Sequence, residues 1–163
     1  MSELVEITRN AANKNSASEQ LLTFMVDGQE YGVDILRVQE IRGWSAPMPI
    51  PNAPGYIKGV INIRGDVVPI ADLRERLGLA SLEYGQTTVV VVLRVQDANR
   101  ERVMGVIVDA MSDVTNVPLD AMKPPPTFAE FSEAPLARGI ATLEDKMITI
   151  LDVDRIFGER AGR

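Results

Sequence analysis

Short apolar runs separated by turn residues dominate the chain. LLTFMV at residues 21–26 is followed by Asp27-Gly28 and then by QEYGVD. An Asp-Gly pair between two strand-like runs is a strong signal for a tight β-hairpin. TTVVVVLRV and RVMGVIVD, on either side of QDANRE, predict a second hairpin. The pattern therefore predicts a mainly β chain built from hairpins.

Helical patterns are brief and begin at acidic residues. Asp34 is placed to cap a turn or two through ILRVQ, and Asp72, with Glu75 in a capping box, opens ADLRERLG. DVDRIFG repeats this pattern after Asp152, and Gly78 suits the end of the earlier helix. The proline-rich stretches PMPIPNAP and KPPP predict extended connectors, because proline donates no hydrogen bond to a ladder.

The chain carries two internal repeats. Residues 59–78 align without a gap to residues 139–158 at a shift of 80, and residues 32–41 align to residues 105–114 at a shift of 73. Two copies of one unit are the expected cause. Each copy is predicted to form a small antiparallel barrel, the first over residues 19–82 and the second over residues 83–158, with tails at residues 1–18 and 159–163.

Composition narrows the functions that this chain can have. The 163 residues include no cysteine and no histidine, which removes thiolate nucleophiles, imidazole bases and most transition-metal sites. A net charge of −6 with scattered basic residues argues against nucleic-acid binding. No apolar run reaches the length of a membrane span, so we expect a cytoplasmic protein without membrane insertion, metal or cofactor.

Several motifs have a structural and a functional interpretation. Asp72 and Asp152 could act as paired carboxylates, although helix capping is favoured because both copies place them at the same helix start. Arg64-Gly65-Asp66 matches an adhesion tripeptide, but a turn is favoured. Glu40 and Arg64 fit either a surface ion pair or a partner site, with the ion pair favoured. The residues by themselves indicate a binding module rather than an enzyme.

From Leu21 to Gly158 the chain resembles the CheW coupling-protein family of bacterial chemotaxis. The resemblance is carried by EYGVDILRVQEIRG, YIKGVINIRGDVVPIADLRERLG and VMGVIVDAMSDV. It implies two five-stranded SH3-like β-barrel subdomains with short helices, packed on a shared apolar seam. It also implies a catalytically silent adaptor that joins the CheA histidine kinase, through its regulatory domain, to the cytoplasmic tips of chemoreceptors in a membrane-associated array. The alternative from a different class is a small β-barrel enzyme that uses Asp or Lys chemistry.

The resemblance also implies site residues. The receptor-binding set is expected near the groove between the barrels, and Lys123 stands where arginine is common in the family. For the kinase these residues are Ile35, Val38, Glu40, Lys58, Lys123 and Phe128, and for the receptor Gly59, Arg64, Gly105 and Val114.

Overall fold

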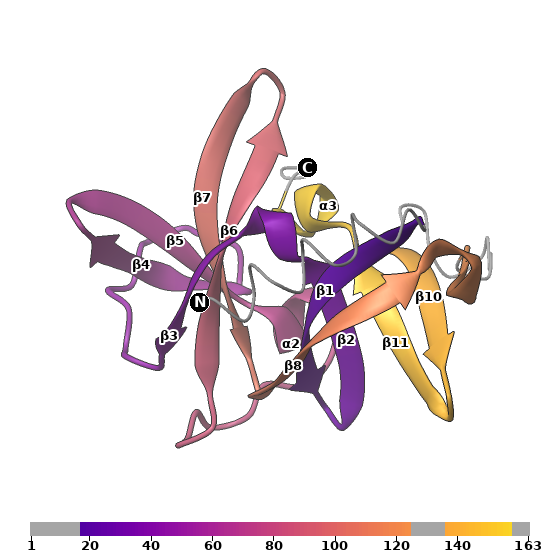
Figure 1. Cartoon of the computed structure of the whole chain (residues 1–163). Helices are drawn as coiled ribbons and strands as arrows, with labels where there is room; N and C mark the ends of the chain where they lie inside the picture. Colours follow the sequence, from indigo (N-terminus) through magenta and orange to yellow (C-terminus); the bar gives the residue numbers. More distant parts are fainter. Residues whose placement is uncertain (1–16, 125–135, 158–163) are drawn as a thin grey trace.

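The computed structural model describes residues 17–124 and 136–157 (Figure 1). The first repeat contains β1 (Ser18–Val26), β2 (Gln29–Asp34), the 3₁₀ turn η1 (Ile35–Arg37), β3 (Val38–Gly43), β4 (Ile57–Ile63), β5 (Asp66–Asp72) and α2 (Leu73–Arg76). The second contains β6 (Val89–Asp97), β7 (Arg100–Val108), β8 (Ala110–Pro118), η2 (Leu119–Ala121), β9 (Met122–Lys123), β10 (Ala137–Leu143), β11 (Lys146–Leu151) and α3 (Val153–Phe157).

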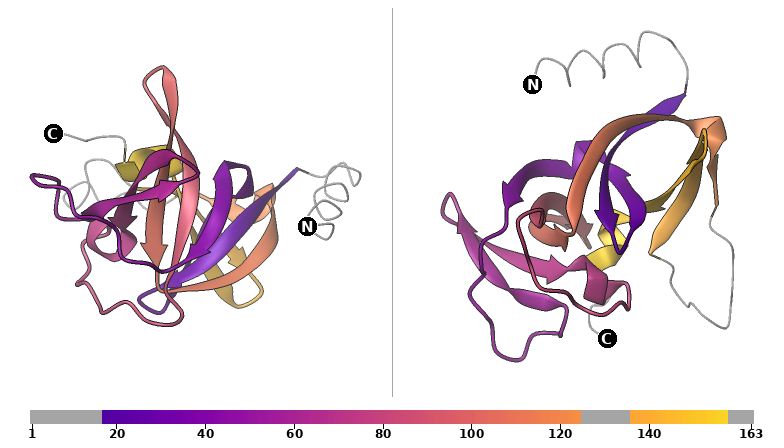
Figure 2. Two further views of the ribbon diagram at one scale, coloured as in Figure 1. Left: turned by 90° about the vertical axis from the view of Figure 1, so that its left-hand side faces the viewer. Right: turned by 90° about the horizontal axis from the view of Figure 1, so that it is seen from below.

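The strands form two sheets, which confirms the mainly β prediction with two β subdomains. Sheet A has the order β8-β1-β2-β11-β10-β9, and sheet B has the order β3-β6-β7-β5-β4. The sheets lie side by side, with α2 and α3 between them (Figures 1 and 2). Sheet A has six strands rather than the expected five because β9 adds Lys123 beside Ile140. Its counterpart in sheet B is a single bridge between Met48 and Val60.

Each repeat places its first hairpin in the sheet of the other repeat. The β1–β2 hairpin lies between β8 and β11 of the second repeat, and the β6–β7 hairpin lies between β3 and β5 of the first. The expected division of the chain into residues 19–82 and 83–158 therefore does not separate the two sheets. That division assumed that each copy closes on itself. The exchange instead gives each hairpin two neighbouring strands from the opposite copy.

The register of the two sheets follows the sequence repeat. β2 pairs with β11 in parallel, with Gly32 opposite Ile150, and β7 pairs with β5 in parallel, with Gly105 opposite Ile70. Gly32 and Gly105 are equivalent at a shift of 73, and Ile70 and Ile150 are equivalent at a shift of 80. The duplication predicted from the sequence is thus visible strand by strand.

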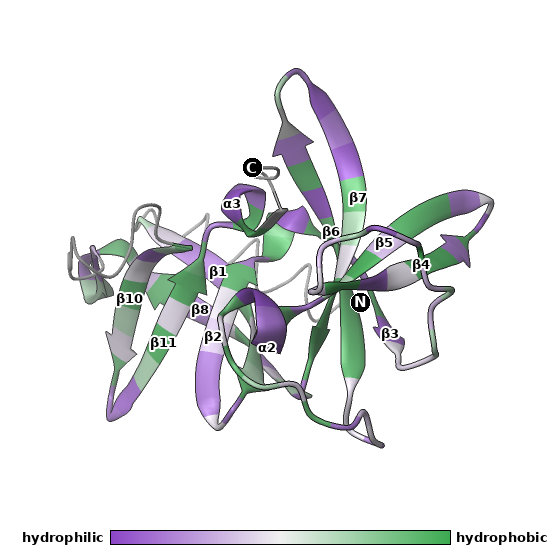
Figure 3. Ribbon diagram, turned by 180° about the vertical axis from the view of Figure 1, so that it is seen from behind, coloured by the Kyte–Doolittle hydropathy of each residue, from purple (hydrophilic) through white to green (hydrophobic). Residues whose placement is uncertain are grey.

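Buried side chains form three clusters. Sheet B has an inner core that includes Ile70 and Val92, and sheet A has one that includes Leu21 and Ile150. The largest cluster, called the central core from here on, takes residues from both sheets and both helices, among them Phe24, Leu93 and Ile156. Hydrophilic residues gather at the hairpin ends (Figure 3). β6 is buried on both faces, because Val91 and Leu93 face the central core while Val90 and Val92 face the inner core.

Turns and caps confirm most of the local predictions. Asp27 and Gly28 both have positive φ, as a two-residue hairpin turn requires. The carboxylate of Asp34 accepts a hydrogen bond from the Leu36 amide at 3.0 Å, and that of Asp72 accepts one from the Arg74 amide at 2.9 Å. The capping box is only half formed, since the Glu75 carboxylate binds Lys58 at 2.6 Å.

Candidate functional site

An ion pair joins the two edge strands of sheet B. Arg64 occupies the β4–β5 turn with φ 51°, followed by Gly65 with φ 91°. Its Nη2 donates to Oε1 of Glu40 on β3 at 2.5 Å, and Nη1 of Arg42 donates to the other carboxylate oxygen at 2.9 Å. The surface ion pair favoured from the sequence is therefore present, and it links the β4–β5 turn to β3.

The charges of this cluster are unequally exposed. Hydrogen bonds from Arg64 and then Arg42 hold the pKa of Glu40 below its ordinary value, despite the opposing effect of burial. The Arg64 side chain remains 67% exposed. Arg64 can therefore reach a partner's carboxylate, while Arg42 remains to neutralise Glu40.

A β-bulge on β3 determines which side chains share a face. Val38 pairs with Leu93, but Glu40 pairs with Val92 and Ile41 with Val91, so one residue is skipped. Residues that pair across a ladder point to the same face. Val38 and Ile41 therefore lie on the face of the central core, and Glu40 lies on the opposite face.

The apolar residues at the start of β3 differ in accessibility. Ile35 and Val38 are half-buried and pack against the central core. Leu36, between them, is 72% exposed, and Ile41 is also exposed. The most accessible apolar contact near η1 is therefore Leu36 rather than the predicted Ile35.

β8 repeats this arrangement at the edge of sheet A. Met111 and Val114 are equivalent to Val38 and Ile41 at the shift of 73, and both are half-buried against the central core. Val114 pairs with Leu22, a central-core residue of β1. The structure thus brings Ile35, Val38 and Val114 onto the rim of one core, which we call the apolar rim.

Gly59 and Gly105, predicted to contact the receptor, are buried and have structural reasons to be glycine. A Cβ on Gly59, which has φ 145°, would lie 2.2 Å from the carbonyl oxygen of Met48. A Cβ on Gly105 would lie 2.8 Å from Cδ1 of Ile70. Both glycines allow close approach between strands, so any effect on binding would act through the shape of sheet B.

The other predicted kinase contacts are not brought together. Lys58 lies on β4 of sheet B and forms an ion pair with Glu75. Lys123 is exposed on β9 of sheet A. Phe128 lies outside the described residues.

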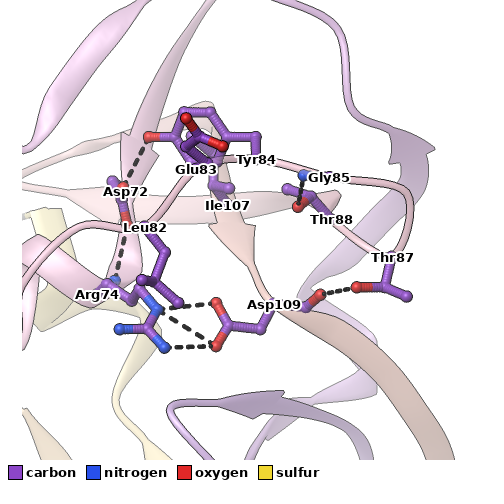
Figure 4. Close-up of a pocket in the computed structure, with 10 residues that line it drawn as sticks. All are labelled: Asp72, Arg74, Leu82, Glu83, Tyr84, Gly85, Thr87, Thr88, Ile107 and Asp109. Atoms are coloured by element: carbon purple, nitrogen blue, oxygen red, sulfur yellow. Dashed lines mark hydrogen bonds and ion pairs between the residues drawn. The ribbon is translucent and has the colours of Figure 1, made fainter.

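A polar cavity of about 200 Å³ lies beside α2 (Figure 4). The Arg74 guanidinium forms hydrogen bonds to both carboxylate oxygens of Asp109 at 3.0–3.3 Å and reaches Asp27 in the β1–β2 turn at 3.2 Å. These carboxylates raise the pKa of Arg74, and the largest cause is the set of hydrogen bonds that Asp109 accepts from it. Because Asp27 belongs to sheet A and α2 follows sheet B, the cluster connects the two subdomains.

The opposite wall of this cavity is also internally satisfied. The Tyr84 hydroxyl donates to Oδ2 of Asp72 at 2.7 Å, and its ring packs on Trp44 with centroids 4.1 Å apart. Burial, followed by this hydrogen bond, raises the pKa of Tyr84. The Asp72 carboxylate therefore holds the helix start and the Tyr84 loop, which confirms the predicted helix cap.

Within residues 17–124 and 136–157, no group of carboxylates is arranged to hold a metal ion. No helix in the same ranges is long and apolar enough to cross a membrane.

Sequence reasoning missed Arg42, Leu36, Ile41 and Met111. The sequence repeat could have indicated two of them. It aligns Ile41 with the predicted site residue Val114, and Met111 with the predicted site residue Val38. Arg42 pairs with Glu40 two residues earlier on the same strand, so the alternation of a predicted strand could also have indicated this pair.

Comparisons with known proteins agree on one family. The model of the CheW-like domain matches residues 20–161. A chemotaxis protein CheW of Rhizobium meliloti (strain 1021) is 38% identical, and the match covers 93% of this chain and 95% of the relative. A chemotaxis protein CheW of Klebsiella aerogenes is 37% identical, and the match covers 87% of this chain and 83% of the relative. The crystal structure of the scaffolding protein TtCheW from Thermoanaerobacter tengcongensis superposes with a TM-score of 0.77 at 29% identity, over 89% of this chain and 95% of that one. A chain with two β subdomains, an internal duplication and these relatives belongs to the CheW family of chemotaxis proteins.

Proposed function

We propose that this protein is a non-catalytic adaptor that couples chemoreceptors to the CheA histidine kinase and is recruited to membrane-associated receptor arrays. Family membership supports this role, because the relatives are chemotaxis proteins and one is a scaffolding protein. Two residues that an Asp- or Lys-based enzyme could have used have structural partners instead: Asp72 caps α2, and Lys58 pairs with Glu75.

The observation that carries the proposal is the position of Arg64 on sheet B. Its guanidinium is exposed at a hairpin turn and touches Glu40, so a receptor contact and a kinase contact would lie next to each other. A planar guanidinium can bind a carboxylate through two parallel hydrogen bonds. We assign Arg64 to the receptor tip, together with Val114 on the apolar rim.

The kinase contact is assigned to the β3 side of sheet B. Leu36 and Ile41 provide exposed apolar area, and Glu40 provides charge. Ile35 and Val38 support this surface from the half-buried rim. Lys123 and Phe128, with Lys58, remain proposed for a second kinase contact. Because Lys58 and Lys123 lie on different sheets, that contact would span both subdomains.

The experiment is a capture assay with purified receptor-tip fragment and the regulatory domain of the kinase. The parent protein should capture both partners. Arg64→Ala should reduce receptor capture and leave kinase capture nearly intact, since Arg42 still pairs with Glu40. Arg64→Lys should restore receptor capture only in part, because lysine lacks the planar fork.

Arg155→Ala is the matched control, since Arg155 is a half-exposed arginine in an ion pair on α3. It should capture both partners as the parent does. Failure of the parent to capture either partner would overturn the adaptor role. Equal loss of both partners in Arg64→Ala would overturn only the assignment of this turn to the receptor.

A further inference from the structure

The two parallel strand pairs, although equivalent by the repeat, each have three residue pairs, but the ladder in sheet B is displaced by two residues along the strands. In sheet A the pairing of β11 with β2 runs from Ile148 opposite Glu30 to Ile150 opposite Gly32. In sheet B the pairing of β5 with β7 begins only at Ile70 opposite Gly105. The two residue pairs that precede this point in sheet A, at Ile148 and Thr149, therefore have no counterpart in the β5–β7 ladder of sheet B.

One residue explains the difference. Pro69 of β5 is equivalent to Thr149 of β11, which pairs with Tyr31. Proline has no N–H, so it cannot donate to a strand on the side of β7. Proline is rare in a strand with neighbours on both sides, and β5 lies between β7 and β4. The sheet accordingly opens at Pro69.

The opening is a groove of about 470 Å³ with two strand edges as its walls. In the strand ladders, residues 66–69 of β5 pair with β4 and residues 100–104 of β7 pair with β6, and the β5–β7 ladder begins beyond them. The β4–β5 and β6–β7 hairpins diverge from this point (Figure 1). Each wall therefore turns an unpaired side of its backbone toward the groove, within the described parts of the chain.

The side chains of the groove are mixed in character. Val67 is 68% exposed, and Val103 is half-buried on the opposite wall. Asp66 and Arg100, both exposed, stand on opposite walls at the open end. Charged residues on a strand edge discourage indiscriminate pairing between sheets. They also favour an occupant that presents charges of both signs at this end.

We propose that this groove binds an extended peptide segment of a partner protein, which adds as a strand between β5 and β7. Main-chain groups face the groove from both walls, although Pro69 contributes no donor, and such groups are satisfied by another extended main chain. Residues 100–104 would give room for a strand of about five residues, or ~16 Å at 3.3 Å per residue. Apolar side chains of the peptide pack on Val67 and Val103, and its acidic and basic residues face Arg100 and Asp66.

The probe is a fluorescently labelled, blocked heptapeptide of sequence Lys-Glu-Val-Thr-Val-Thr-Val, titrated with the whole protein and followed by anisotropy. Saturable binding is expected. A second peptide with proline at both threonine positions should not bind, because it lacks main-chain donors. Absence of saturable binding up to the solubility limit of the first peptide, or equal binding of the proline peptide, would overturn the proposal.

Two variants locate the site. Val67→Asp should raise the Kd of the first peptide at least tenfold. Met147→Asp is its matched control, since Met147 is equivalent to Val67 and 62% exposed, but lies next to the closed parallel ladder, which begins at Ile148. Met147→Asp should bind as the parent does. Equal weakening by the two substitutions would place binding elsewhere and overturn the proposal.

Pro69→Thr tests the cause of the opening. Threonine restores the donor present at Thr149, so β5 and β7 should pair two steps further and exclude the peptide, again raising its Kd at least tenfold. Protection from hydrogen exchange of the new amide at position 69, with added protection of the amides of residues 103–104 on β7, would report the closure. A Pro69→Thr protein that closes in this way and still binds the peptide with the Kd of the parent would overturn the groove as the site.

Discussion

Individual side chains near η1 and β3 divide into those that hold the fold and those that remain available to a partner. Ile35 packs against the central core, whereas Leu36 points outward from the same turn. The carboxylate of Glu40 is occupied by two arginines, of which only Arg64 is largely exposed. Residues adjacent in sequence therefore have different roles here.

Leu36→Asp should weaken kinase binding without lowering the melting temperature. The side chain is already exposed, so the substitution removes apolar contact area only from a complex. Ile35→Asp is the contrasting variant, and it should lower the melting temperature because a charge would be buried against the central core. Thermal unfolding and kinase capture are measured on both variants. A Leu36→Asp protein that binds the kinase normally would remove η1 from the proposed contact.

Glu40 should make the stability of the protein depend on pH in the acidic range. Its pKa in the folded state lies below the ordinary value of 4.5, so its pairing stabilises the protein above that pH and is lost as the pH falls through the folded-state pKa. The melting temperature of the parent should exceed that of Glu40→Gln near neutral pH. The difference should shrink below about pH 4.5, and a difference independent of pH would contradict the ion pair.

At the scale of elements, close approach between strands limits the choice of residue. β4 meets the connector after β3 at the bridge between Met48 and Val60, and the carbonyl of Met48 points at Gly59. β5 and β7 meet where Gly105 makes room for Ile70. Both glycines therefore mark places of close approach, Gly59 within the first repeat and Gly105 between the two repeats.

Gly59→Ala should destabilise the protein by roughly 2–5 kcal/mol, because it combines a strained φ with a clash against backbone. Gly43→Ala is the control, since a Cβ at Gly43 would have open space around it. It should change the free energy of unfolding by no more than about 0.5 kcal/mol. Chemical denaturation measures both values. Similar stabilities for the two variants would show that the Met48 connector moves away at little cost.

The whole molecule depends on the exchange of hairpins between repeats. Sheet B cannot connect β3 to β5 without β6 and β7, and sheet A cannot connect β8 to β11 without β1 and β2. The cluster of Arg74, Asp109 and Asp27 adds a polar link between the sheets. The two repeats are therefore one folding unit rather than two independent domains.

Two half-chains test this dependence. Fragments 1–81 and 82–163 divide the chain within residues 79–85, which have no regular secondary structure. Neither fragment alone should unfold cooperatively, and an equimolar mixture should regain cooperative thermal unfolding and the β-sheet circular dichroism spectrum. A fragment that folds by itself would show that one repeat can close its own barrel and that the exchange is dispensable.

The sequence alone determined the local structure and the duplication. Asp27-Gly28 predicted a hairpin, and Asp34 and Asp72 predicted helix starts, because turns and caps involve only residues close in the chain. The gapless repeat predicted equivalent strands, which the two registers confirm. Family motifs predicted an adaptor fold and proposed its contacts residue by residue.

Only the tertiary structure decided which strands share a sheet. The β1–β2 and β6–β7 hairpins are both apolar on two faces, so their local sequence pattern would fit a central position in either sheet. The choice depends on which strands cover them, and that involves residues far apart in sequence. The same reason applies to the pairing of Glu40 with Arg64, the burial of Gly59 and Gly105, and the opening at Pro69. Each depends on how one strand meets another segment of the chain, so each emerged only from the fold.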